Sequence, residues 1–233
     1  MLNINHKNKK SIIIFITISV ITVFIVTSVY LLAQNKITEN KENHQKSILN
    51  KILSSDSIKY NNNILKSIIY IKNNQYLKSQ DYLPVYIATF NNKITAIIIE
   101  TIAPDGYNGK INVLVALKPN FQNIKSSKII NIKITNHEET PGLGDKFDEN
   151  KYHQKATKWL NLFQDKSLMN PQNNKKWTVK KDYNDAIIDS WTGATITPRA
   201  ITKAAYNVLL FFEKNYKTII DTKYKEKIII QNF

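Results

Sequence analysis

The run with the clearest capacity for chemistry lies near the C-terminal end, where residues 189–198 read Asp-Ser-Trp-Thr-Gly-Ala-Thr-Ile-Thr-Pro. Proline is tolerated at the first position of a helix, and a threonine before it caps free amides, so the run predicts a helix that starts at Pro198 with Thr197 before it. Thr195 then lies at the mouth of a helix N-terminus. The unpaired N–H groups and about half a positive charge at such an end favour a bound phosphate.

These residues also have an ordinary structural interpretation. Thr-Gly pairs are common in turns, and Thr-Pro is common at helix starts, so Gly-Ala-Thr alone would carry little weight. The longer run resembles the flavinylation motif Asp-x-x-Ser/Thr-Gly-Ala-Thr of proteins that carry FMN in phosphoester linkage to the last threonine. Every fixed position of that motif is present in residues 189–195.

The resemblance implies that Thr195 is the attachment residue for covalent FMN, with Thr192, Gly193 and Ala194 contributing to the cofactor site. Gly193 has no Cβ, so a phosphate or a modifying enzyme can approach its backbone, and Ala194 is the smallest residue that keeps a side chain.

Three further runs agree in order and spacing with one family. Residues 105–109 read Asp-Gly-Tyr-Asn-Gly, residues 137–146 read His-Glu-Glu-Thr-Pro-Gly-Leu-Gly-Asp-Lys, and residues 177–182 read Trp-Thr-Val-Lys-Lys-Asp. With the motif they resemble the FMN-carrying G subunit of the Rnf (or Rsx) electron-transport complex, a relative of the C subunit of sodium-pumping NADH:quinone reductase. The chain departs from the family at Trp191 and in the polar insert at residues 170–174.

Residues 139–144 predict a loop, because one proline and two glycines interrupt regular structure, and glycine lets backbone approach a flat ligand. By the resemblance, the loop supplies part of the isoalloxazine pocket through Thr140, Gly142, Leu143 and Gly144. We expect Leu143 to pack on the ring and Thr140 or a backbone amide to bond its polar edge. The alternative is an ordinary tight turn after a strand.

Four nearby residues keep two interpretations each. Asp189 either positions the motif for a transferase or bonds nearby backbone amides in its own turn. His137 and Lys146 either tune the charge around the flavin or have surface roles. Tyr107 either lines the same pocket or packs a turn.

The first forty residues contain a membrane-spanning pattern. Residues 11–33 carry no charge and are dominated by Ile, Val, Phe and Leu; as a helix this run is about 35 Å long, more than a hydrocarbon core of about 30 Å. A cleaved signal peptide is the alternative, but its apolar region is shorter and residues 30–34 offer a poor cleavage site. Lysines on both sides leave the orientation undecided by charge, with Lys9 and Lys10 leaning toward a cytoplasmic N-terminus.

The composition excludes several function classes. The net charge of +15 invites a nucleic-acid interpretation, yet the lysines are scattered and Arg199 is the only arginine, so we expect no nucleic-acid partner. Cysteine is absent, which excludes disulfides and cysteine-held iron–sulfur clusters. With four scattered histidines, we expect no metal site. An organic cofactor fits best.

The remaining pattern predicts an α+β fold: a single transmembrane helix followed by an FMN-binding domain with an antiparallel sheet and packed helices. The expected divisions are a tail at 1–10, the membrane helix at 11–33, a juxtamembrane helical segment at 34–80 broken near 61–63, and the domain at 81–233. Within the domain we expect a hairpin turning at Asn91-Asn92. Further strands are expected at 111–117, 129–135 and 177–180, and helices at 152–163 and from 198 to about 216, the last with a buried apolar stripe.

No residue looks like a catalytic acid, base or nucleophile, so we expect electron relay rather than independent turnover. The resemblance implies other Rnf/Rsx subunits and a flavin transferase as partners, the bacterial inner membrane as the location, and a soluble domain that faces the periplasm. Two alternatives remain: a membrane-anchored binding module with an unused flavin site, and an anchored protein that binds polyanions through its lysines.

Overall fold

The computed structural model describes residues 6–54, 58–169, 176–179, 186–191, 194–223 and 230–231. The chain divides into two units, Met1–Leu49 and Asn50–Phe233. The second unit begins well before residue 81, where the sequence places the start of the domain.

Helix α1, His6–Ile52, is continuous over 47 residues. Its large apolar side chains from Ile12 to Leu32 are exposed on all sides, which distinguishes it from an amphipathic surface helix. The hydroxyls of Thr17, Ser19 and Thr22 each donate to the carbonyl four residues earlier at 2.9 Å, so these polar groups are paired inside the helix. By length and composition α1 can cross a membrane.

The juxtamembrane prediction is wrong in its second half. Ile64 lies in a short 3-10 helix, Ile64–Lys66, and Ile68 begins strand β1, Ile68–Lys72. The alternating burial of β1 has the period of a strand, and its isoleucines are β-branched residues that favour this conformation. Ile64 and Ile68 are four residues apart, which is the spacing of one face of an α-helix, but neither lies in an α-helix.

A sheet with the order β5-β4-β3-β2-β1-β8 forms the framework of the second unit. The predicted antiparallel arrangement is confirmed for β1 to β5, whereas β8 pairs with β1 in parallel. Asn91 and Asn92 join β2 and β3 with φ of 49° and 63°, the left-handed values expected of a tight hairpin turn. The strand bounds are β2 Leu83–Phe90, β3 Lys93–Gly106, β4 Gly109–Lys118, β5 Lys128–Asn136 and β8 Ile230–Gln231.

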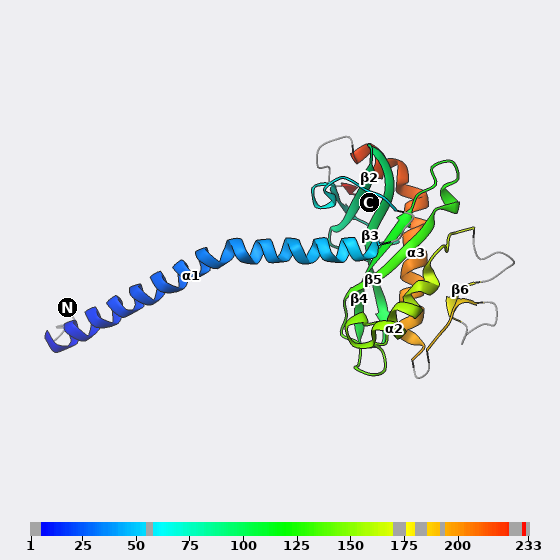
Figure 1. Cartoon of the computed structure of the whole chain (residues 1–233). Coiled ribbons are helices and arrows are strands. Elements are labelled where there is room, and N and C mark those ends of the chain that lie inside the picture. The colour runs from blue at the N-terminus through cyan, green and yellow to red at the C-terminus, as the bar shows by residue number, and fades with distance from the viewer. Residues whose placement is uncertain are drawn as a thin grey trace. The chain divides into compact units, whose positions relative to one another are not determined.

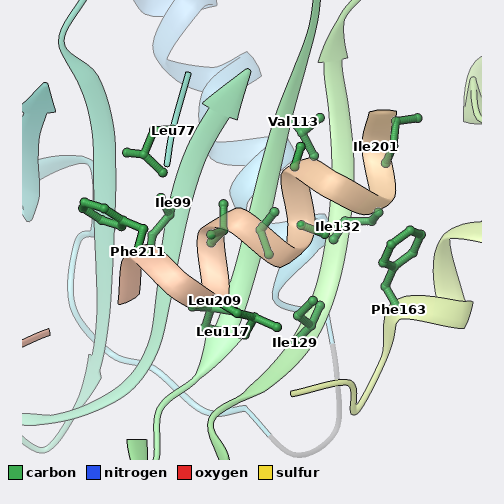
Figure 2. Close-up of a cluster of buried hydrophobic side chains, with 14 of the residues drawn as sticks. Leu77, Ile99, Val113, Leu117, Ile129, Ile132, Phe163, Ile201, Leu209 and Phe211 are labelled. Carbon is green, nitrogen blue, oxygen red and sulfur yellow. The ribbon is translucent and has the colours of Figure 1, made fainter. Parts of the chain in front are cut away.

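Helix α3, Ile196–Lys223, contacts β3 and β4 along one face of this sheet (Figure 1). The predicted apolar stripe is confirmed as core: its members, Ile201, Ala204, Ala205, Val208, Leu209 and Phe212, are at most 2% exposed. Figure 2 shows Ile201 and Leu209 among side chains from the strands, including Val113, Leu117 and Ile132. This packing fixes the helix whose first turn follows Thr195.

The smaller elements lie between β5 and α3 in the sequence. Helix α2, Glu149–Leu160, is capped by the Asp148 side chain and continues into a 3-10 helix, Asn161–Phe163, so the predicted helix at 152–163 starts three residues earlier. Strands β6, Lys176–Val179, and β7, Ala186–Ile188, form a separate parallel pair, and β6 packs against α3.

Candidate functional site

Thr195 occupies the N-cap position of α3. The helix begins at Ile196, and the carbonyl oxygen of Thr195 accepts the first intrahelical hydrogen bond, from the Arg199 amide at 3.1 Å. The predicted start at Pro198 is therefore wrong by two residues. Pro198 is the third helical residue, where its missing N–H is one that no intrahelical carbonyl would use. The cap is thus Thr195 itself, half-buried at the positive end of a 28-residue helix.

The rest of the predicted motif is only partly described. Thr192 and Gly193 lie outside the described residues, as does the insert at 170–174. Ala194 is half-buried, and its amide donates to the carbonyl of Trp191 at 3.4 Å in an isolated antiparallel bridge. Trp191 and Ala194 therefore lie opposite each other, directly before Thr195.

The loop at 139–144 is a series of turns between β5 and α2. The carbonyl of Thr140 accepts hydrogen bonds from the amides of Leu143 at 3.2 Å and Gly144 at 3.1 Å. Gly142 has φ of 80°, and a Cβ placed there would meet nothing within 4 Å, so open space lies in front of it. Leu143 is 52% exposed, which leaves an apolar side chain available to a ligand.

A buried carboxylate joins the loop to α3. Glu139 is 4% exposed and accepts a hydrogen bond from the Thr197 hydroxyl at 2.5 Å. Its other oxygen accepts a hydrogen bond of 3.1 Å from the backbone N–H of Asn108, at the β3–β4 turn. The structure thus brings three of the runs singled out in the sequence together around one side chain.

A second buried carboxylate, that of Asp145, accepts a hydrogen bond from within the same loop. Asp145 has no exposed surface, accepts from the Gly142 amide at 2.7 Å and pairs with Lys151 of α2 at 2.9 Å. Burial raises the pKa of Asp145, but the hydrogen bonds from Lys151 and Gly142 outweigh it and lower the pKa overall. The loop therefore keeps a fixed negative charge at neutral pH.

Trp191 of the motif belongs to an aromatic cluster. Trp191 packs against Trp159 with ring centroids 4.5 Å apart and against Phe147 at 6.2 Å. Phe147 in turn contacts His137 at 4.8 Å, edge to face. His137 therefore has a packing role, whereas Tyr107, at the hairpin tip, is 67% exposed.

Comparisons with known proteins place these features in a family. The profile of the FMN-binding domain matches residues 106–210. A protein from Aliivibrio fischeri (strain MJ11) is 32% identical over 91% of this chain and 93% of its own length, and one from Vibrio vulnificus is 34% identical over 95% of both. A protein from Shewanella loihica is 37% identical over 70% of both chains. All three are named as the G subunit of an ion-translocating oxidoreductase complex.

The chain belongs to this G-subunit family. The resemblance inferred from its motifs is confirmed, as is the fold of an apolar N-terminal helix followed by an α+β FMN-binding domain.

In this member of the G-subunit family, the described residues offer features that suit the phosphate and the ring of FMN. A helix N-terminus suits its phosphate, and the open space at Gly142 with the exposed Leu143 suits an apolar ring. The Nε1 of Trp191 is buried with no hydrogen-bond partner among the described residues. Among those same residues, no group of His, Asp and Glu side chains has the arrangement of a metal site.

Sequence reasoning assigned no role to Glu139 or Asp145. The one local signal for Glu139 is Gly144, where the backbone passes too close to this side chain for a Cβ. The link to Thr197 was not visible, since it joins residues 58 positions apart.

Proposed function

We propose that this chain is the membrane-anchored electron-transfer subunit of an Rnf-type ion-translocating oxidoreductase, with FMN joined to Thr195 through a phosphoester. The observation that carries the proposal is the N-cap position of Thr195, because the N–H groups of the first helical turn have no intrahelical acceptor and favour a phosphate there. In the flavinylation motif that the chain resembles, this residue is the last threonine.

The attachment reaction requires a separate flavin transferase that uses FAD. The Thr195 oxygen forms a bond to the phosphorus of the FMN half, the pyrophosphate P–O bond breaks, and AMP leaves with the proton. Gly193 and Ala194 are the smallest residues of the motif and would leave the backbone accessible to the transferase.

FMN supplies electron transfer once bound, and the chain supplies placement. The loop residues Thr140, Gly142, Leu143 and Gly144 would hold the ring, with the exposed Leu143 side chain offering it an apolar contact. Asp145 holds the loop's turn through the Gly142 amide. The covalent link retains the cofactor where no free FMN pool would replace it.

We infer that α1 is an uncleaved anchor in the bacterial inner membrane and that the second unit faces the periplasm. The apolar surface on all sides of α1 and its internally paired hydroxyls support the anchor. The partners are the lipid bilayer and the other components of the complex, as expected from the family to which the chain belongs.

The test is ultraviolet fluorescence of denaturing gels, run on the full chain from membranes of cells that coexpress a flavin transferase. We expect a fluorescent wild-type band, a dark Thr195→Val band, and a Thr192→Ala band that retains flavin. Mass spectrometry of the peptide that contains residue 195 locates the adduct. A dark wild-type band, with the transferase active on a control acceptor, overturns the proposal in favour of a binding module with an unused flavin site.

A further inference from the structure

The carboxylate of Glu139 lies where three segments of the domain meet. One oxygen accepts from the hydroxyl of Thr197, the second residue of α3, and the other accepts from the Asn108 amide of the β3–β4 turn. Thr197 has no exposed surface, so the bond between the two side chains is shielded from water. The carboxylate therefore ties the loop and the hairpin to the first turn of the helix.

Gly144 makes room for this carboxylate, because a Cβ there would overlap one Glu139 oxygen. At Gly106 a Cβ would first meet the carbonyl oxygen of Gly109 across the β3–β4 turn, and then the other Glu139 oxygen at 2.7 Å. Neither glycine has a positive φ, so close approach rather than backbone conformation accounts for both. The close approach at Gly144 thus leaves room for a carboxylate at position 139.

The hydrogen bonds and the helix offset the cost of burying the side chain. An unpaired buried charge is strongly unfavourable, whereas here both oxygens have donors and the N-terminus of α3 favours a negative group. Removing the Thr197 hydroxyl leaves one buried oxygen without its donor. The first turn of α3 would then lose the bond that holds it against the loop.

We propose that Glu139 is a positioning residue for flavin attachment, acting through Thr197 to hold the first turn of α3 so that the Thr195 hydroxyl is presented in one orientation. The inference rests on the proposed function, because it concerns the same site. Thr195 is two residues from Thr197, so a shift of the first turn moves the nucleophilic oxygen directly. A misplacement of about 1 Å can cost as much as about 100-fold in rate.

The experiment measures the rate of flavin incorporation into the detergent-solubilised full chain, with purified transferase and FAD, as a function of acceptor concentration. We expect Thr197→Val and Glu139→Gln each to lower kcat about 10- to 100-fold. Thr197→Ser, which keeps the hydroxyl, should stay within about twofold of wild type. Since both residues act through one bond, the double variant should be no slower than the slower single variant, within about twofold.

Thr202→Val is the matched control. Thr202 is also a fully buried threonine of α3, but its hydroxyl donates to the Pro198 carbonyl of the same helix, at 2.7 Å. This variant should incorporate flavin at the wild-type rate. Thermal unfolding of each unmodified variant tests whether that variant is folded at the assay temperature.

The outcomes separate this inference from the function it rests on. A wild-type chain that accepts no flavin overturns both. Wild-type rates for Thr197→Val and Glu139→Gln, beside a dark Thr195→Val, overturn the positioning role and leave the function intact. Equal slowing by Thr202→Val also overturns it, because general loss of stability would then explain the effect.

Discussion

Nε1 of Trp159 donates a hydrogen bond of 2.7 Å to the carbonyl oxygen of Asp189, the first residue of the run that resembles the flavinylation motif. Trp159 lies near the end of α2, 30 residues earlier in the sequence. Its ring also packs on Trp191 within the motif. The end of α2 therefore holds the segment that leads to Thr195.

Trp159→Phe should lower the free energy of unfolding by about 1–3 kcal/mol, because it removes this bond and part of a buried ring. Trp177→Phe is the comparison, since Nε1 of Trp177 is buried without a partner and its loss removes no bond among the described residues. Denaturant unfolding of both variants measures the difference. An equal or greater loss for Trp177→Phe would show that the bond to Asp189 contributes nothing.

Removing either member of the pair formed by Asp145 and Lys151 should change the free energy of unfolding by different amounts. Asp145 is fully buried, whereas the Lys151 side chain is 48% exposed. Lys151→Met leaves a buried carboxylate without its cation and should lower the free energy of unfolding. Asp145→Asn leaves a lysine that water can solvate and keeps an oxygen for the Gly142 amide, so it should cost less at pH 7. Denaturant unfolding compares the two variants, and a larger loss for Asp145→Asn would contradict the prediction.

The pH dependence of the same pair follows from the lowered pKa of Asp145. An acid with a lowered folded-state pKa stabilises the protein above its ordinary pKa of 3.8, and this contribution disappears as the pH falls through the folded value. The difference in Tm between wild type and Asp145→Asn should therefore shrink on acidification below pH 3.8. A constant difference down to about pH 2 would contradict the assignment.

The half-buried carboxyl of Glu100 predicts the opposite dependence of stability on pH. Burial raises its pKa, and the hydrogen bond from Asn112 at 3.3 Å only partly offsets this effect. The group then opposes folding once the pH rises above its ordinary value of 4.5 toward the raised folded value. Glu100→Gln should raise Tm at pH 7, and the gain should vanish well below pH 4.5 in thermal scans. A lower Tm for the variant at pH 7 would refute this.

The sequence predicted elements whose signal is local and missed those that depend on distant partners. The asparagines at 91 and 92 predicted a hairpin because positive φ is a property of the residue, and the stripe on α3 predicted core because its period is regular. The sequence predicts helix where strand β1 lies, since five residues show the two-residue period of a strand only weakly and the strand depends on pairing with β2.

The candidate site divides in the same way. A short motif predicts Thr195 as the attachment residue, and the predicted helix start at Pro198 is two residues too late, because proline is tolerated throughout the first turn. The role of Glu139 was not found, because it depends on contacts with residues 31 and 58 positions away.

The C-terminal end of α1 belongs to the folded unit, which predicts where the chain can be shortened. Ile52 and Leu53 are 1% and 2% exposed, and Ile52 lines a hollow with Ile132 of β5 and Thr157 of α2. A chain that starts at Gln34 keeps both side chains, so its second unit should unfold cooperatively without the apolar segment. A chain that starts at Ile58 loses them, which should cost about 3–6 kcal/mol at about 1.5–3 kcal/mol per buried side chain. This is a large part of a typical domain's stability of about 5–15 kcal/mol. Denaturant unfolding of the two chains measures the difference, and equal midpoints would mean that the end of α1 does not stabilise the domain.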